Sequence, residues 1–188
     1  MGENVMKHPN KIKVIEPFLI LIVITVVGIY LLNAFNSGSW LWFQGKAAVL
    51  EPPSRIVVVN NGERLVLQPG TDFYNELSEA AVQALSEFNN TDLVSIGLSD
   101  QTLLDYAEDS LVVELYFDRP LQFNTLARTG EPTQLLIPID GRHAAGAYVF
   151  RGAQGEWWFG AVRMADPSSL YTVLQQMGFS AAVFQSAG

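Results

Sequence analysis

The chain contains no cysteine, and this absence removes several chemistries at once. Without thiols there are no disulfides, thiolate metal sites, iron–sulfur clusters or cysteine nucleophiles, and no cysteine for lipid attachment. The redox compartment stays open, because an oxidising compartment permits disulfides without requiring them. A domain of the length present here is expected to fold on its hydrophobic core, without disulfides or metal.

Histidine is almost as scarce, with two residues in a chain of 188. His8 precedes the long apolar stretch, so only His143 can serve the part of the chain that follows it. A zinc site or a haem site needs more ligands than one histidine can supply in the absence of cysteine. We therefore expect no metal and no cofactor.

Sequence motifs for catalysis are also missing. Gly152 and Gly155 are not followed by the Lys-Ser/Thr pair, or the strand-to-helix context, of a phosphate-binding loop. His143 has no nucleophile-elbow sequence to accompany it, which disfavours a Ser-His-Asp arrangement. One acidic cluster lacks the spacing and the turn glycine of an EF-hand and is expected to be a solvated edge: Asp100, Asp105, Glu108 and Asp109. The sequence does not indicate an enzyme.

Basic residues are few and unevenly placed, since 11 Lys and Arg against 19 Asp and Glu give a formal net charge of −8. Lys7, Lys11 and Lys13 precede the apolar stretch, and the acidic excess follows it. An acidic domain repels phosphate backbones and anionic headgroups. This argues against nucleic acid as a partner and against docking on a membrane through general charge.

The longest apolar run covers residues 18–35, FLILIVITVVGIYLLNAF, and contains no charged residue. A helix of that length covers about 27 Å, close to the hydrocarbon thickness of a bilayer. Pro17 suits the first turn of a helix, and Glu16 favours the positive end of its dipole. We predict a single transmembrane helix over residues 17–36 that contacts the bilayer.

The residues that flank the run predict its orientation. Trp40 and Trp42 follow it, and amphipathic rings of this kind concentrate at bilayer interfaces, so we expect both to be membrane-interface anchors. The lysines before the run place that side in the cytoplasm by the positive-inside rule. The prediction is a cytoplasmic tail over residues 1–16, a tether over residues 37–54 and an extracytoplasmic domain over residues 55–188, held at the cell membrane.

A cleaved signal peptide is the alternative to this anchor. It also has a basic start and an apolar core, and Ser37-Gly38-Ser39 offers a small-residue cleavage site. Its apolar core is ordinarily about 7 to 15 residues long, shorter than the run found here. Two tryptophans would also be an unusual start for a soluble mature protein. We therefore favour the uncleaved anchor.

Hydrophobic periodicity in the domain alternates between strand and helix patterns. Asn61-Gly62 between two β-branched runs predicts a hairpin. A helix is expected over residues 73–88 with Thr71 or Asp72 as its cap, and a shorter one from Ser99 to Tyr106 with Ser99 as its cap. Further strands are expected over residues 111–117, 134–139, 147–151 and 156–163, with a last helix over about 166–177.

These elements predict an α+β domain: one mixed or antiparallel sheet of five or six strands with two or three helices packed on one face. Aromatic residues crowd its last hairpin. Adjacent strand residues face opposite sides, so one of Trp157 and Trp158 is expected in the core and the other on the surface. Exposed aromatic patches commonly mark partner surfaces, although helices or the membrane-proximal side can cover such a face. The candidate partner or ligand surface consists of Tyr148, Phe150, Trp157, Trp158, Arg142 and His143.

The expected function is that of a non-catalytic, membrane-anchored extracytoplasmic interaction module. It would be an accessory, regulatory or sensor subunit whose partner is another membrane or extracytoplasmic protein. The alternatives are a small-ligand or peptide-binding domain that uses Arg142, His143 and the Trp pair, and an enzyme of an unfamiliar kind. A deep cleft holding His143 and a carboxylate would favour the enzyme, and a filled core with an exposed aromatic strip would favour the interaction module.

Overall fold

The computed structural model describes residues 15–37 and 50–185, which belong to two compact units that divide after Gly45. The first unit contains the helix α1 (Ile15–Ser37). Its segment Pro17–Phe35 has a mean hydropathy of 2.6 and is long and apolar enough to cross a membrane. The predicted interface residues Trp40 and Trp42 lie outside the described residues. Most of the predicted tail and tether also lie outside them.

Polar side chains within α1 bond to the helix itself. Thr25 Oγ1 donates to the carbonyl of Leu21 at 2.9 Å, and Asn33 Nδ2 donates to the carbonyl of Ile29 at the same distance. Each bond reaches back one turn, which is the usual way for such groups to be satisfied in an apolar helix. These side chains therefore do not interrupt the apolar surface with unpaired donors.

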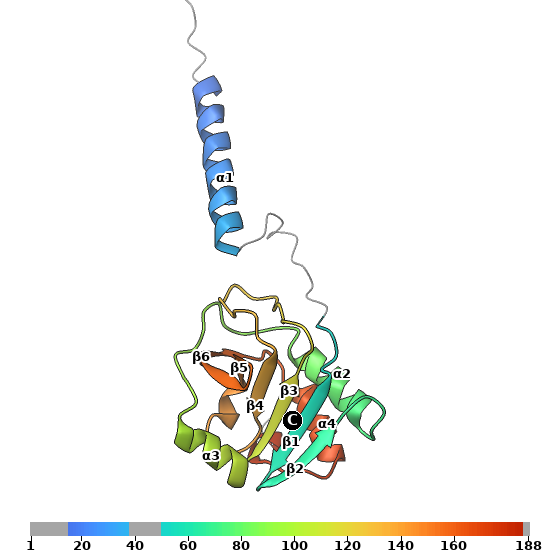
Figure 1. The fold of residues 1–188 in the computed structure, drawn as a ribbon. Coiled ribbons are helices and arrows are strands. Elements are labelled where there is room, and N and C mark those ends of the chain that lie inside the picture. Colours follow the sequence, from blue (N-terminus) through green and yellow to red (C-terminus); the bar gives the residue numbers. More distant parts are fainter. Residues whose placement is uncertain (1–14, 38–49, 186–188) are drawn as a thin grey trace, which may run out of the picture. The chain divides into compact units, whose positions relative to one another are not determined.

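The second unit is built on one six-stranded sheet in the order β2-β1-β3-β4-β5-β6 (Figure 1). Every neighbouring pair is antiparallel. This confirms the predicted α+β class and decides between a mixed and an antiparallel sheet. The strands are β1 (Arg55–Asn60), β2 (Glu63–Leu67), β3 (Leu111–Tyr116), β4 (Gln134–Pro138), β5 (Tyr148–Ala153) and β6 (Glu156–Arg163).

The hairpin β1-β2 has the two-residue turn that its sequence predicts. Asn60 pairs with Glu63, and the two residues between them have positive φ, 48° at Asn61 and 84° at Gly62. Positive φ at both central positions defines the type I′ turn, whose twist matches that of the flanking strands. This turn fixes the register of β2 along β1.

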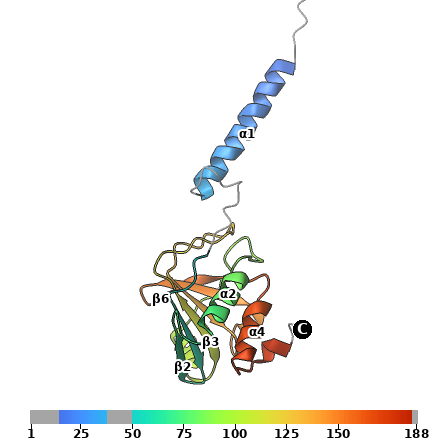
Figure 2. The ribbon, with the colours of Figure 1, turned by 90° about the vertical axis from the view of Figure 1, so that its right-hand side faces the viewer.

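Helices cover both faces of the sheet, so the prediction that they pack on one face is wrong. The helices α2 (Tyr74–Ala84) and α4 (Ser168–Gln176) lie together on one side, as Figure 2 shows. The helix α3 (Asp100–Glu108) lies on the opposite side, where its Tyr106 packs into a separate apolar cluster. The described residues of the domain also form two short 3-10 helices, η2 (Ala144–Gly146) and η3 (Ala182–Gln185).

Strand alternation explains the two apolar clusters. In β1, Ile56 and Val58 face the larger cluster under α2 and α4, while Val57 and Val59 face the smaller one. All four are buried, so β1 is covered on both sides. A continuous β-branched run suits such a strand better than an alternating one.

The helix ends confirm one predicted cap and correct another. Ser99 caps α3, and its side chain accepts a hydrogen bond from the backbone N–H of Thr102. Helix α2 has neither of its predicted caps, because Phe73 occupies the N-cap position with a φ of 61°. The Thr71 hydroxyl instead bonds to the backbone of Gln68, closing the turn before the helix.

Packing of the domain extends N-terminal of Arg55. Leu50 is buried in the larger apolar cluster, and the Tyr74 hydroxyl donates to the carbonyl of Pro53 at 2.5 Å. Buried hydroxyls of this kind require a partner. The residues just before β1 are therefore held against α2.

Candidate functional site

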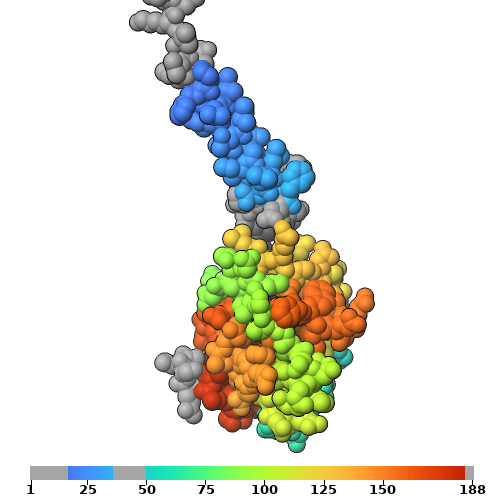
Figure 3. Space-filling model, turned by 90° about the vertical axis from the view of Figure 1, so that its left-hand side faces the viewer, coloured from blue at the N-terminus to red at the C-terminus, as the bar shows by residue number. Residues whose placement is uncertain are grey.

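The two edges of the sheet differ in whether another segment covers them. Along the outer side of β6, the N–H of Val94 donates to the carbonyl of Ala161 at 2.9 Å, and the N–H of Ala161 donates to the carbonyl of Val94 at 3.1 Å. Gly160 donates to the carbonyl of Ile96 at 2.8 Å. In Figure 3 the green atoms of this covering segment lie against the orange atoms of the β5-β6 hairpin. This edge is already occupied by the chain itself.

The edge at β2 is open. Within residues 50–185, β1 is the only strand that pairs with β2, and no isolated bridge reaches it. The residues Glu63 to Val66 are all exposed, and the apolar side chains of Leu65 and Val66 are 43% and 47% exposed. An open edge with apolar side chains on both faces is a template for pairing with another strand.

The hairpin register determines which backbone groups of β2 point outward. Residues that flank a two-residue turn bond to each other, so Glu63 turns its N–H and C=O towards β1. Leu65 and Leu67 do the same, because this direction alternates along an antiparallel strand. The N–H and C=O groups of Arg64 and Val66 therefore point away from the sheet.

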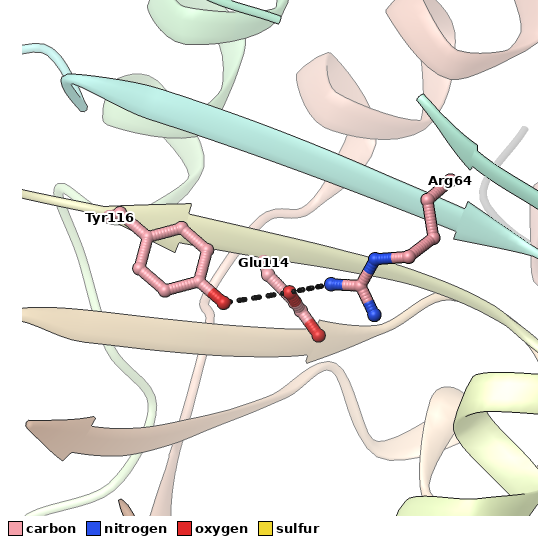
Figure 4. A network of polar contacts seen from close by, with 3 residues as sticks. All are labelled: Arg64, Glu114 and Tyr116. Atoms are coloured by element: carbon pink, nitrogen blue, oxygen red, sulfur yellow. Dashed lines mark hydrogen bonds and ion pairs between the residues drawn. The ribbon is translucent and has the colours of Figure 1, made fainter. Parts of the chain in front are cut away.

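A polar network fixes β2 from the side of the smaller apolar cluster (Figure 4). Arg64 Nη2 lies 2.9 Å from Glu114 Oε2, and the Tyr116 hydroxyl donates to the same oxygen at 2.8 Å. The Glu114 side chain is only 13% exposed, so its charge is neutralised in a sheltered position. The network joins β2 to β3 across the intervening β1.

The electrostatics of this network keep the hydroxyl of Tyr116 protonated, so that it remains a hydrogen-bond donor. Burial, and then its hydrogen bond to Glu114, raise the pKa of Tyr116 to about 12. The Arg55 guanidinium lies 4.1 Å from the centroid of the same ring, within the range of a cation–π contact. Oε2 of Glu114 is thus contacted by both Arg64 and Tyr116, and the network acts as a structural clamp between β2 and β3.

Of the predicted surface residues, His143, Tyr148 and Phe150 lie together, but Phe150 is fully buried and is not part of the surface. The His143 ring centroid is 5.4 Å from that of Phe150 and 6.4 Å from that of Tyr148. His143 Nδ1 lies 2.8 Å from the hydroxyl of Tyr106, which donates to the backbone carbonyl of Arg142 at 2.6 Å. Burial, and then the charge of Arg142, lower the pKa of His143. The His143 ring is thus held among aromatic side chains, and its surroundings disfavour the protonated form.

The two tryptophans take different surroundings, but neither is fully buried. Trp157 lies opposite Gly152 and packs against the smaller apolar cluster. The Trp158 ring lies over Gly130, where an added Cβ would come within 2.9 Å of it. Both are half-buried, so the expectation of one core and one surface tryptophan is wrong. The exposed aromatic of this strand is Phe159, with 70% exposure.

Arg151, which the sequence analysis did not single out, is a buried cation. Its side chain is 2% exposed, and its guanidinium donates to the backbone carbonyls of Thr129, Phe159 and Gly160. No described carboxylate pairs with it, and its Nε has no partner in the described part of the chain. Burial lowers the pKa of Arg151. The residue ties the long connection between β3 and β4 to the β6 strand.

A surface depression of about 220 Å³ lies near the end of α2, away from the predicted residues. No group of three or more potential ligand residues is placed to hold a metal within the described ranges. The depression is lined by Gln83, Ala84, Ser86, Glu87, Ala165 and Asp166.

Comparisons with protein-family models, with curated proteins and with solved structures found no match for this chain. The geometry of the domain is therefore the evidence for its function. Its unused binding capacity lies in the backbone of β2, where Arg64 and Val66 have outward N–H and C=O groups. By contrast, the side chains of Glu114 and His143 already have hydrogen-bond partners within the fold, Tyr116 and Tyr106 respectively.

Proposed function

We propose that the chain is a membrane-anchored extracytoplasmic binding module that accepts an extended segment along β2. The observation that carries this proposal is the open edge, with outward backbone groups at Arg64 and Val66 beside exposed Leu65. In strand addition, main-chain hydrogen bonds supply affinity and alternating side chains supply specificity. The module would serve as an accessory, regulatory or sensor subunit, without catalysis of its own.

The edge lacks two of the usual devices that prevent strand pairing, a proline and a β-bulge. Proteins protect edges with prolines, bulges or charges that project over the edge. The five residues of β2 include no proline, and their register with β1 is continuous. The charge of Arg64 is drawn back across β1 to Glu114, so it is directed away from the edge. The clamp therefore leaves the outward backbone groups accessible.

The anchor supports a location at a membrane. Segment Pro17–Phe35 has the length and hydropathy of a span, and the nearby lysines favour a cytoplasmic N-terminus. The domain would then lie outside the cytoplasm. A reporter fused to the C-terminus tests this orientation, and a reporter active only in the cytoplasm would contradict it.

Site-specific photo-cross-linking tests the binding edge in the full chain. A photoreactive amino acid in place of Glu63, at the exposed start of β2, should give a discrete adduct in membranes. Val66→Pro should abolish the adduct, because proline removes an outward N–H that the added strand needs. Val66→Thr, which keeps the N–H and the branched shape, should retain it.

The controls separate pairing from unfolding and from chance contact. The same photoreactive residue in place of Leu126, which is 83% exposed in the β3-β4 connection, should not give the proline-sensitive adduct. Thermal unfolding should show that Val66→Pro leaves the domain folded, since this position does not donate to β1. An adduct at Glu63 that survives Val66→Pro in a folded chain would refute strand addition.

A further inference from the structure

We infer that the strand added to β2 is β2 of a second copy of this chain, so that the two sheets join into one. This inference rests on the proposed strand addition and names its partner. It follows from the symmetry of the edge itself. The two outward-pointing residues, Arg64 and Val66, lie on either side of Leu65.

A twofold rotation about Leu65 brings complementary groups together. It places Arg64 of each copy opposite Val66 of the other, and both residues point their N–H and C=O across the new boundary. Each such pair makes two hydrogen bonds in an antiparallel sheet, giving about four in all. A register shifted by two residues would leave one hydrogen-bonded pair of residues within β2 instead of two. The register centred on Leu65 therefore uses the edge most fully.

Side chains in this register are also compatible. Leu65 meets Leu65 of the second copy, so two half-exposed apolar side chains cover each other. Val66 meets the aliphatic part of Arg64 of the second copy, whose guanidinium is held by its own Glu114. Opposed like charges would destabilise a strand pair, and no directly opposed pair within β2 is of like charge.

The size of the contact argues for pairing at a membrane rather than in solution. Two strands of this length bury less than the roughly 1,200 Å² of a standard stable interface. Confinement to a bilayer raises the effective concentration of one copy around another, which strengthens weak contacts.

The rotation axis is perpendicular to the sheet, so the two β1 strands begin at opposite ends of the joined sheet. The twelve residues 38–49 can reach up to about 40 Å if extended, which allows both spans to enter one bilayer.

The absence of native cysteine makes the register directly testable. Leu65→Cys introduces the sole thiol of the full chain. Residues opposite each other at this kind of position have Cα atoms about 4.5 Å apart, within the range of a disulfide. Mild oxidation in membranes should therefore give a disulfide-linked dimer.

Two matched variants distinguish pairing from collision. Leu126→Cys, an exposed leucine replaced outside β2, and Glu63→Cys, which lies opposite Leu67 of the second copy, should each give about tenfold less dimer, because disulfides require Cα atoms within about 7 Å. Addition of Val66→Pro to Leu65→Cys should remove the dimer while the chain stays folded. Equal yields of disulfide-linked dimer from Leu65→Cys and Glu63→Cys would overturn the register centred on Leu65.

The outcomes also separate this inference from the proposed function. If Leu65→Cys gives no dimer but the photoreactive residue at position 63 gives a proline-sensitive adduct with another protein, self-pairing is wrong and strand addition stands. If neither product forms in folded chains, both are wrong. A Leu65→Cys dimer that Val66→Pro abolishes supports both.

Discussion

Arg151 shows how a single buried charge can organise distant segments. Its guanidinium contacts three backbone carbonyls from two parts of the chain, and no carboxylate of the described residues balances it. Charged donors make stronger hydrogen bonds than neutral ones, which offsets part of the cost of burial. The contacts with the carbonyls of Thr129 and Gly160 are buried, so these two acceptors depend on Arg151 in place of water.

Replacement of this residue should be costly even though it removes a buried charge. Arg151→Met should lower the free energy of unfolding by about 3 kcal/mol, because buried acceptors lose their donors. Arg151→Lys should recover only part of the loss, since an ammonium cannot reproduce the forked geometry. Denaturant unfolding of a chain that begins at Lys46 measures both. A Met variant as stable as the unaltered chain would show that the carbonyls find other partners.

His143 should make the domain less stable at mildly acidic pH. Its pKa is lowered in the folded state, so the folded chain binds its proton less readily than the unfolded chain does. The stabilisation is complete above the unfolded-state pKa of about 6.5 and is lost as the pH falls towards the folded-state value.

The comparison variant for this effect is His143→Asn. Asparagine tolerates the positive φ of 70° at this position and does not titrate. The free energy of unfolding measured between roughly pH 5 and 7 should fall less steeply for the variant, because it lacks the titrating imidazole. Parallel pH profiles for the two chains would show that the histidine does not contribute.

At the scale of elements, the β5-β6 hairpin can be tested through its tryptophans. Because Trp157 and Trp158 are both half-buried, Trp157→Ala and Trp158→Ala should each cost about 2 kcal/mol, less than loss of a fully buried ring. Phe159→Ala should change stability little, since that ring is 70% exposed. The unfolding free energies of the three variants test these expected losses of stability. A large loss at one tryptophan and none at the other would restore the expectation of one core and one surface ring.

Local patterns predicted the elements well because their causes are local. The Asn61-Gly62 turn, the Ser99 cap and the alternation in β3 all depend on residues close in sequence. The positions of the elements relative to one another were less accessible. Placement of α3 on the second face depends on long-range packing, which no local pattern in the sequence indicates.

The binding edge could not be found from the sequence for the same reason. Which strand lies at an edge is decided by the order of all six strands, and the cover over β6 comes from a segment that precedes it by some sixty residues. Arg64 and Glu114 are fifty residues apart, and their contact requires β2, β1 and β3 to be adjacent. The sequence predicted a binding surface at the aromatic residues instead, because their clustering is visible along the chain.

At the scale of the whole molecule, the apolar helix and the acidic domain have complementary roles in the proposal. The net charge of −8 keeps separate copies apart in solution, where a short strand pair cannot hold them. An anchor in a bilayer confines the copies and favours pairing. Binding at β2 should therefore depend on the presence of residues 17–36.

Hydrogen exchange at the outward amides of β2 tests this account most directly. In a dilute chain beginning at Lys46, the amides of Arg64 and Val66 should exchange rapidly, while that of Leu65, bonded to β1, should exchange slowly. In the full chain in membranes, strand addition predicts that the Arg64 and Val66 amides become protected, read residue by residue by mass spectrometry. Equally rapid exchange of these two amides in both settings, with Leu65 still protected, would show that the edge is unoccupied and would contradict the proposed function.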